Sequence, residues 1–173
     1  DALAAVTAAT TWTTVAPEQT YASLPVNVGL TIPDNNATGI SSSINVVDDL
    51  TVERVEVVFS ATHSFRGDLR VVLTSPDGTQ SILAEPHNDP NNNYTSWTFT
   101  STHHWGESSV GQWTLTVSDE GASDVGTWND WSLRIHGTAA PVGPAAPRVL
   151  SSTPTGNVVS AVDSLLFHFN ESM

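Results

Sequence analysis

Apolar residues recur at every second position in five segments of this chain, and that spacing limits what the chain can fold into. The segments are 26–30, 55–59, 69–73, 113–117 and 131–135. Side chains of a β-strand point alternately to its two faces, so this period marks strands that bury one face and expose the other. In the last two segments the intervening positions carry Thr, Ser and Arg, as half-buried antiparallel strands require. The sequence therefore predicts an all-β domain, a β-sandwich rather than an α/β enzyme core.

Turn and loop residues separate these segments. The turn Ser75-Pro76-Asp77-Gly78 combines proline, which presets φ, with glycine, which supplies a positive φ. We expect this turn to join strands at 69–74 and 79–84 into a hairpin. Two longer polar loops, 85–93 and 119–130, are long enough to carry a binding function.

The charge balance excludes several classes of partner. Five Arg and no Lys face eighteen Asp and Glu, a formal net charge of −13, so nucleic acid and anionic membrane surfaces are poor partners. The chain has no cysteine and lacks the run of about 18 apolar residues that membrane insertion needs. An acidic, Lys-free chain rich in Thr, Ser and Asn is typical of secreted proteins. We therefore expect a secreted, extracellular or cell-surface protein, with Ca²⁺ as the cation that its surface would attract.

The first residues of the chain predict a short helix. Leu3 and Val6 lie three positions apart in an Ala-rich run that Asp1 could cap. About eleven residues are marginal for an isolated helix in water. We therefore expect this helix to be stable only against another surface, with Trp12 as its anchor. That surface could belong to the following domain or to a different one.

The sequence changes character after residue 138. Residues 139–147 contain three prolines and no apolar period, which predicts a semi-rigid linker and a domain boundary. Residues 148–173 alternate again at Leu165, Phe167 and Phe169 and resemble the opening strands of a bacterial Ig-like repeat. Since so short a segment cannot complete a sandwich, we interpret it as a truncated next module, poorly ordered or paired with a neighbour's sheet edge.

Several sequence blocks between residues 21 and 138 share their order and spacing with a known family. The blocks are Ile32-Pro33-Asp34-Asn35, Phe65-Arg66-Gly67-Asp68-Leu69, Ser75-Pro76-Asp77-Gly78, Thr102-His103-His104-Trp105-Gly106-Glu107, Gly111-Gln112-Trp113 and Trp131-Ser132-Leu133. Together they resemble the P domain of kexin- and furin-type proprotein convertases. The segment in front of them, up to Trp12-Thr13-Thr14-Val15-Ala16-Pro17, resembles the last helix and exit segment of the subtilisin-like catalytic domain in the same proteins.

This resemblance implies a jelly-roll β-sandwich of about eight mainly antiparallel strands, with a short N-terminal helix. It divides the chain into the end of a catalytic domain (1–20), a P domain (21–138), a Pro/Ala linker (139–147) and the truncated start of an Ig-like domain (148–173). On this hypothesis the chain is a fragment of a larger protease and begins inside the catalytic domain.

The resemblance also implies a function. A P domain is not catalytic, docks on the subtilisin-like catalytic domain of the same parent chain, stabilises it, and tunes its calcium and pH dependence. The candidate docking residues are Trp12, Tyr21, Phe65, His103 and Trp105, and an isolated domain could form a dimer through the same face. The loop at 85–89 lacks the basic residue that relatives often carry there.

Two motifs imitate functional sites. His136-Gly137-Thr138 resembles the sequence around a subtilisin general base, but it ends a strand, and the chain has no Gly-Thr-Ser-Met nucleophile segment, so a triad cannot be assembled. We therefore expect no catalytic residue in this chain, and a subtilisin-like serine endopeptidase as its parent. Arg66-Gly67-Asp68 spells an adhesion tripeptide, but it leads directly into a strand, which favours a structural corner.

A calcium site is the metal site that the sequence favours. Asp119, Asp124 and Asp130 belong to one polar loop, and Asp68 could join them if its strand begins at the same edge of the sandwich. Calcium takes six to eight oxygen ligands. The alternative is an acidic loop that is simply solvated.

The six tryptophans suggest an alternative function. Trp113 and Trp131 are in phase with apolar strand residues and are expected in the core. Trp97, Trp105 and Trp128 are left as candidate surface aromatics. The competing hypothesis is therefore a free-standing adhesion or carbohydrate-binding jelly-roll module of a large surface protein. We prefer the hypothesis that these aromatic residues belong to a face that docks on a protease domain.

Overall fold

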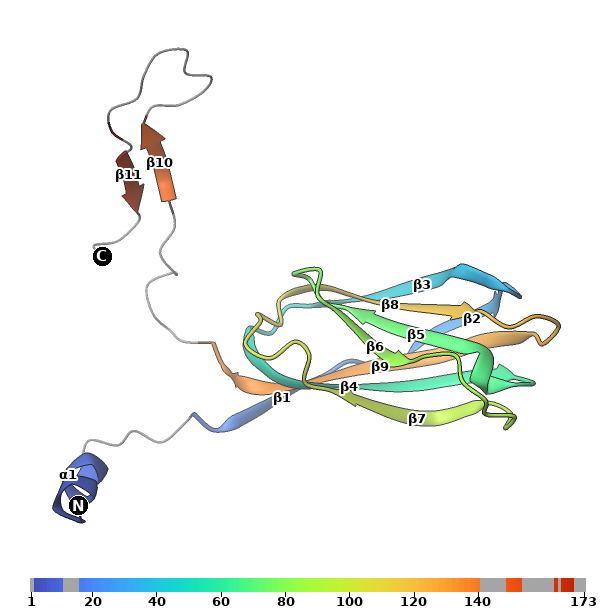
Figure 1. Ribbon diagram of the computed structural model, residues 1–173, viewed down its shortest axis with the longest axis horizontal. Helices are drawn as coiled ribbons and strands as arrows, with labels where there is room; N and C mark the ends of the chain where they lie inside the picture. The colour runs from blue at the N-terminus through green and yellow to red at the C-terminus, as the bar shows by residue number, and fades with distance from the viewer. Residues whose placement is uncertain (1, 11–15, 141–148, 154–163, 165, 170–173) are drawn as a thin grey trace. The chain divides into compact units, whose positions relative to one another are not determined.

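The computed structural model describes residues 2–10, 16–140, 149–153, 164 and 166–169. The chain divides into two units, residues 1–140 and 141–173, and the division falls inside the Pro/Ala segment. The first unit contains helix α1 (Ala2–Thr10), nine strands and a short 3₁₀ turn, η1 (Arg66–Asp68) (Figure 1). The strands are β1 (Glu18–Ala22), β2 (Val26–Ile32), β3 (Asn36–Val46), β4 (Leu50–His63), β5 (Leu69–Thr74), β6 (Gln80–Ala84), β7 (Tyr94–Ser101), β8 (Gly111–Asp119) and β9 (Gly126–Ala139).

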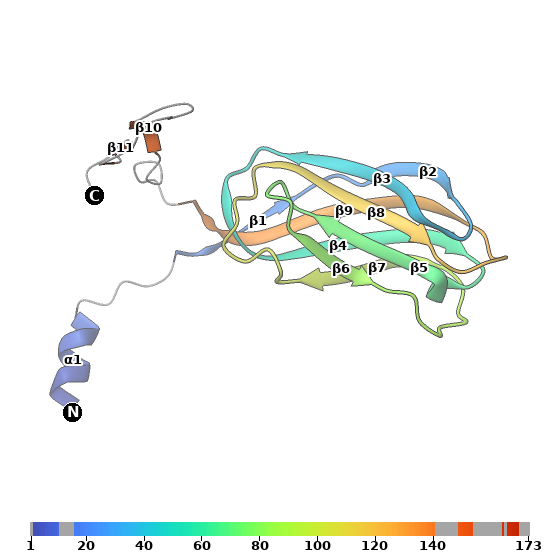
Figure 2. The same ribbon diagram turned by 45° about the horizontal axis from the view of Figure 1, so that its top comes forward.

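The nine strands form two antiparallel sheets that lie face to face (Figure 2). One sheet has the order β1–β9–β4–β7, with β2 also paired to β9, and the other has the order β3–β8–β5–β6. β1 pairs with the second half of β9 and β2 with its first half, so these two short strands occupy one strand position. Each sheet therefore has four strand positions, and the two sheets face each other. This confirms the predicted all-β sandwich of about eight antiparallel strands.

The inward faces of both sheets form one apolar core. Trp113 and Trp131 are fully buried, as predicted, and their indole N–H groups donate to the Ser109 carbonyl (2.9 Å) and to Ser42 Oγ (3.0 Å). Burying each large aromatic side chain contributes roughly 1.5–3 kcal/mol or more. The alternating segments at 55–59, 69–73, 113–117 and 131–135 thus line this core, whereas Leu30 of the segment 26–30 is 53% exposed, because the register of β2 shifts between Asn27 and Leu30.

The expectation that Trp128 is a surface aromatic is wrong, because its side chain is 0% exposed. In the pairing of β9 with β4, Asp130 lies opposite Ser60 and Trp128 opposite the next residue, Ala61, so Asn129 is an extra residue. Such a bulge resets the alternation by one position. Trp128 and Trp131 therefore both point inward although they lie three residues apart.

A second irregularity depends on one glycine. The register between β3 and β8 shifts between Asn36 and Ile40, and Asn36 Oδ1 accepts the backbone N–H groups of Thr38 (2.9 Å) and Gly39 (3.3 Å) inside this turn. Gly39 has φ +61°, and a Cβ atom there would collide with the carbonyl group of Val117. A side chain at this position is therefore excluded by both the backbone conformation and the space.

No described side chain of helix α1 belongs to the apolar core. The described side chains of α1 are exposed, while the anchor residue Trp12 and the cap Asp1 lie outside the described residues. No helix in the described part of the chain is long and apolar enough to cross a membrane. In the second unit β10 (Val149–Thr153) pairs antiparallel with β11 (Leu166–Phe169). Its assignment to an Ig-like repeat stays a prediction.

Replacing Gly39 by Ala should lower the free energy of unfolding by more than about 3 kcal/mol, because the new methyl group meets backbone atoms. Gly78→Ala is the matched control, since Gly78 also has a positive φ (+87°) but nothing lies within 4 Å of its added Cβ atom. The control substitution should lower the free energy of unfolding by only about 1 kcal/mol. Urea unfolding of both variants measures the difference, and equal losses would contradict the close contact at Gly39.

Candidate functional site

The loop between β7 and β8 is held rigidly at the end of the sandwich where the chain enters and leaves. Glu18 pairs with Thr138, and Leu50 pairs with Ala139, so β1, β4 and β9 meet at this end (Figure 1). Val52 donates its N–H to the Glu107 carbonyl (2.9 Å) and accepts the N–H of Gly106 (2.7 Å). The loop is thereby attached to the start of β4.

This rigid loop presents a large apolar side chain to solvent. Trp105 is 68% exposed, and two more apolar residues at the same end, Val47 and Val110, are 74% and 44% exposed. His103, also exposed, precedes Trp105 and Val110 in the β7–β8 loop, whereas Val47 lies between β3 and β4. Exposed tryptophan on a fixed backbone is typical of surfaces that bind another protein, because its burial removes much apolar area with little loss of conformational entropy. We call Val47, His103, Trp105 and Val110 the docking surface, after the docking that the sequence predicts for His103 and Trp105.

The structure brings some of the predicted docking residues together and separates another. Tyr21 lies on β1, packs half-buried against the core, and has its pKa raised first by burial and then by the charge of Asp48. It thus lies in the same half of the sandwich as His103 and Trp105. Phe65 instead precedes η1 at the opposite end, and Trp12 lies outside the described residues.

A buried histidine lies directly beneath the docking surface. His104 is 1% exposed, its ring meets the ring of Trp113 edge-on at 5.0 Å, and neither ring nitrogen has a hydrogen-bond partner among the described residues. Its Nδ1 atom is 3.8 Å from Glu107 Oε2, which is also buried without a partner. Burial lowers the pKa of His104, outweighing the neighbouring charge of Glu107, which raises it.

His103 and His104 lie in a turn in which Trp105 donates its N–H to the Thr102 carbonyl (3.2 Å), and they are exposed and buried respectively. No sequence pattern indicated that the buried histidine would lack hydrogen-bond partners, because that depends on what the core places around it.

The opposite end of the sandwich contains a buried pair of polar residues. His63 ends β4 and Asp119 ends β8, and both side chains are 0% exposed. His63 Nε2 lies 3.0 Å from Asp119 Oδ2, and His63 Nδ1 lies 2.8 Å from the Phe65 carbonyl oxygen. The second oxygen of Asp119 accepts the N–H of Gly121 (3.2 Å). This pair ties the two sheets together at this end, as buried polar groups do when every atom has a partner.

One predicted calcium ligand, Asp119, belongs to this pair, and two others, Asp68 and Asp124, lie near it. Burial raises the pKa of the Asp68 carboxyl, and the charges of Asp119 and Asp124 raise it further. Asp124 accepts a hydrogen bond from Ser64 Oγ (2.6 Å). Asp130 does not join them, because it lies opposite Ser60, four residues or about 13 Å along β9 from Gly126, which is opposite His63.

The Arg-Gly-Asp tripeptide forms a closed corner. The Arg66 guanidinium donates to Asp89 Oδ2 (2.7 Å) and lies 5.4 Å and 5.1 Å from the ring centres of Tyr94 and Trp97. Arg66 is also the largest influence that lowers the pKa of Asp89 to about 2. Gly67 is buried against the backbone of the 87–89 loop. The Arg66 side chain and Gly67 are thus engaged inside the protein, as the structural-corner interpretation predicts.

His136 also has structural contacts only. Its Nδ1 atom lies 3.0 Å from Thr20 Oγ1 and 3.6 Å from Glu18 Oε1, and its Nε2 atom lies 3.5 Å from Glu56 Oε1. These contacts join β1, β9 and β4 on the outer face of the sheet. Nothing in this arrangement presents a serine hydroxyl to the imidazole.

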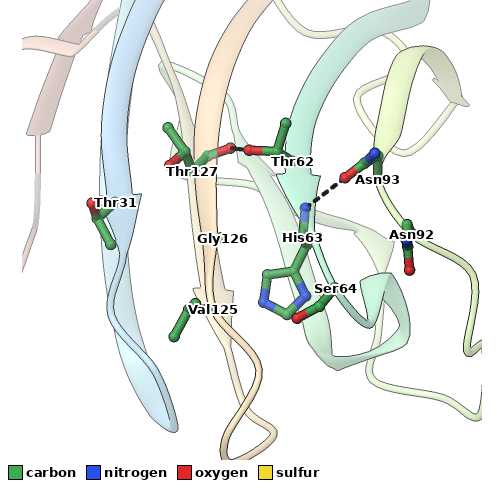
Figure 3. A pocket seen from close by; sticks show the side chains of 9 residues that line it. All are labelled: Thr31, Thr62, His63, Ser64, Asn92, Asn93, Val125, Gly126 and Thr127. Carbon is green, nitrogen blue, oxygen red and sulfur yellow. Dashed lines mark hydrogen bonds between the residues drawn. The ribbon is translucent and has the colours of Figure 1, made fainter.

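A polar hollow of about 460 Å³ opens beside the His63–Asp119 pair. It lies where β2, β4 and β9 meet at this end, and the loop before β7 forms its rim (Figure 3). Thr31, Thr62, Thr127, Asn92 and Asn93 supply hydroxyl and amide groups to its surface.

Comparison with known families now identifies the sandwich. Residues 52–135, from the start of β4 through most of β9, match the family described as the proprotein convertase P-domain. This segment is a P domain. The match includes the loop of Trp105, the Arg-Gly-Asp corner and every residue of the hollow except Thr31 on β2.

Relatives of the whole chain come from the same group of proteins. The chain is 33% identical over 151 residues to furin-1 of Xenopus laevis, covering 81% of this chain and 19% of that protein. It is 38% identical over 129 residues to endoprotease bli-4 of Caenorhabditis elegans, covering 71% of this chain and 14% of that protein. The chain thus spans about a fifth or less of the length of these relatives.

A solved structure shows the same P-domain fold. The serine protease of Aeromonas sobria superposes with a TM-score of 0.65 and 26% identity, over 77% of this chain and 29% of that protein. The same protease in complex with its chaperone gives a TM-score of 0.66 over 79% of this chain and 30% of that chain. The similarity is again confined to a part of the larger protein.

His104→Phe should reduce the acid sensitivity of folding, because Phe keeps a ring beside Trp113 but takes up no proton. The pKa of His104 is lowered in the folded chain, so the unfolded chain binds the proton first as pH falls below about 6.5. The stability that neutral His104 provides is therefore present above pH 6.5 and lost as pH falls through its folded pKa. Urea unfolding at neutral pH and in mild acid measures the free energy of unfolding. Its decrease from neutral pH to mild acid should be smaller for His104→Phe than for the wild type.

His103→Phe is the matched control for this measurement. His103 is the exposed neighbour of His104, so its replacement should leave the acid-induced loss at the wild-type value. An equal loss in all three proteins would show that His104 does not contribute to the pH dependence.

Proposed function

We propose that this chain is the non-catalytic P domain of a secreted, kexin-type subtilisin-like serine endopeptidase, and that it docks on the catalytic domain and stabilises it. The observation that carries the proposal is the docking surface. Trp105 is exposed on a rigid loop at the end of the sandwich where β1 begins. Apolar surface held this way is complementary to a protein partner.

The covalent connection supports this choice of partner. In the proposed parent the catalytic domain precedes β1, so its surface is held close to the end of the sandwich that carries Trp105. Docking between tethered domains is intramolecular, and a short connection gives an effective concentration in the millimolar range. A modest apolar contact is then sufficient to keep the two domains together.

Charged contacts fix the connecting strand to the sandwich. Arg54 on β4 donates to Glu18 at the start of β1 (2.6 Å), and Thr20 and His136 are in hydrogen-bond distance across β1 and β9. An exposed ion pair is weak because water screens it, but these contacts act together with the backbone pairing of β1 and β9. The orientation of β1 relative to the docking surface is therefore constrained.

Stabilisation would follow from thermodynamic linkage. An interface that exists only when both domains are folded adds its free energy to the unfolding of the catalytic domain. A few kcal/mol is a large fraction of the roughly 5–15 kcal/mol that stabilises a domain. The lowered pKa of His104, beside Trp105 in the sequence, would make this contribution sensitive to acid, which supports the proposed influence on pH dependence.

Calcium has weaker support. Ca²⁺ needs six to eight oxygen ligands, and among the residues the structure describes no group of three or more acidic or His side chains is arranged to hold a metal ion. Both oxygens of Asp119 already accept hydrogen bonds or face His63, and Asp130 lies apart. The arrangement does not fit the ion, so calcium binding at Asp119, Asp124 and Asp130, joined by Asp68, stays a prediction of the sequence.

Trp105→Ala in the full parent protease should weaken docking by about 2 kcal/mol, or roughly thirtyfold, because truncation of a central aromatic removes most of its buried area. The catalytic domain should then lose activity at a lower temperature, while unfolding of this chain alone changes by less than about 0.5 kcal/mol. Residual proteolytic activity after heating measures the first effect and urea unfolding the second.

Ile82→Ala is the control, because Ile82 is an apolar residue that is 48% exposed on β6, outside the docking surface. It should leave the heat resistance of the protease unchanged. The proposal fails if Trp105→Ala protease is as heat-resistant as the wild type. The predicted dimer of the isolated chain would use the same surface, so sedimentation of the Trp105→Ala chain tests it as well.

Asp68→Asn tests calcium. In EDTA this variant should be more stable than the wild type at neutral pH, because the raised pKa of Asp68 shows that its negative charge is disfavoured in the folded chain. If the sequence prediction of calcium holds, excess CaCl₂ raises the Tm of the wild type and not that of Asp68→Asn. Identical wild-type Tm values in EDTA and in CaCl₂ would contradict calcium binding.

A further inference from the structure

Three threonines form a row on the floor of the polar hollow. Thr31 on β2 and Thr62 on β4 both pair with Thr127 on β9, and Figure 3 shows them on three neighbouring strands. Adjacent strands lie about 4.8 Å apart, so the three side chains are regularly spaced across the sheet. The hydroxyl groups of Thr31 and Thr127 have no hydrogen-bond partner among the described residues, and each can donate one hydrogen bond and accept others.

The rim of the hollow adds amide groups and one apolar side chain. Asn93 Oδ1 accepts the N–H of His63 (2.9 Å), which leaves the amide NH₂ of Asn93 to donate elsewhere. Asn92, which also lines the hollow, makes no hydrogen bond within the described part of the chain, and Val125 provides an exposed apolar wall. Hydroxyl and amide groups beside a small apolar surface match a ligand that carries hydroxyl groups on a carbon ring.

The floor of the hollow is rigid. His63, which belongs to it, is held by Asp119 at 3.0 Å and by the Phe65 carbonyl at 2.8 Å. Asn93 is held with φ +58° by its bond to His63. A site with fixed groups binds a ligand at a lower entropic cost than a mobile loop does.

Charge and size restrict the ligand further. The side chains of the hollow carry no carboxylate, but Asp124 is bonded to Ser64 on its edge, and Asp68 and Asp119 lie close by. This field repels anionic ligands. The volume of about 460 Å³ lies within the roughly 300–1,000 Å³ of small-molecule sites.

We propose that the hollow is a binding site for a neutral sugar unit, recognised by the hydroxyl groups of Thr31, Thr62 and Thr127 and the amides of Asn92 and Asn93. The site lies at the opposite end of the sandwich from Trp105, so it does not depend on the docking function and would bring a glycan to the domain while the docking surface is occupied. Because no aromatic side chain lines the hollow, binding of one sugar unit is weak, with a dissociation constant of about 1–10 mM.

The test is a titration of the full chain, labelled with ¹⁵N, with the methyl glycosides of glucose, galactose, mannose and N-acetylglucosamine. At least one of them should produce saturable chemical-shift changes at the amides of Thr31, Thr62, Asn93 and Thr127. Thr127→Val keeps the shape and strand propensity of the residue and removes its hydroxyl group. It should weaken binding about fivefold or more, the loss expected for one hydrogen bond.

Thr98→Val is the matched control, because Thr98 is an exposed threonine on β7 of the same sheet, outside the hollow. It should bind as the wild type does, and both variants should give the dispersed spectrum of a folded chain. The proposal is overturned if none of the four glycosides produces saturable shifts at the hollow, or if binding is the same in Thr127→Val and Thr98→Val. Shifts centred on Trp105 would overturn it too, since they place the sugar elsewhere.

Discussion

The antiparallel pairing of β4 with β9 is the contact on which the rest of the structure depends. Its register runs from Leu50 opposite Ala139 to His63 opposite Gly126, so one ladder of hydrogen bonds extends from the docking surface to the polar hollow. β1, β2 and β7 join their sheet only through these two strands. The loop of Trp105 is bonded to one end of β4, and the pair of His63 with Asp119 closes the other. Both proposed sites are therefore supported by the same element.

The strands and most of the core could be predicted from the sequence because a period of two is a local property. Trp113 and Trp131 follow that period and are buried, and the turn at 75–78 joins the expected hairpin, with Ser75 donating to the Thr79 carbonyl. Trp128 could not be placed, because the bulge at Asn129 appears only when β9 is aligned with β4. Its burial is set by a partner strand more than sixty residues earlier in the chain.

The candidate sites were less predictable, for the same reason. Trp105 was recognised as a surface residue from its motif, whereas Phe65, grouped with it, lies at the other end of the sandwich. The sequence places Asp130 in one loop with Asp124, but in the fold Asp130 lies within strand β9. The threonine row of the hollow is invisible in the sequence, because it exists only through the registers of three strands. Which residues share an end of a sandwich is decided by pairings between distant segments.

The position of β1 has a mechanical consequence. Glu18 at the start of β1 pairs with Thr138 near the end of β9, so the strand ends to which the two flanking segments are attached lie side by side. A force that pulls those segments apart would load the hydrogen bonds between β1 and β9 one after another, in the manner of a zipper, instead of all together in shear. β1, with only five residues, would peel away first and leave the core intact. Tension along the chain would thus loosen the connection in front of the sandwich well before it unfolds the domain.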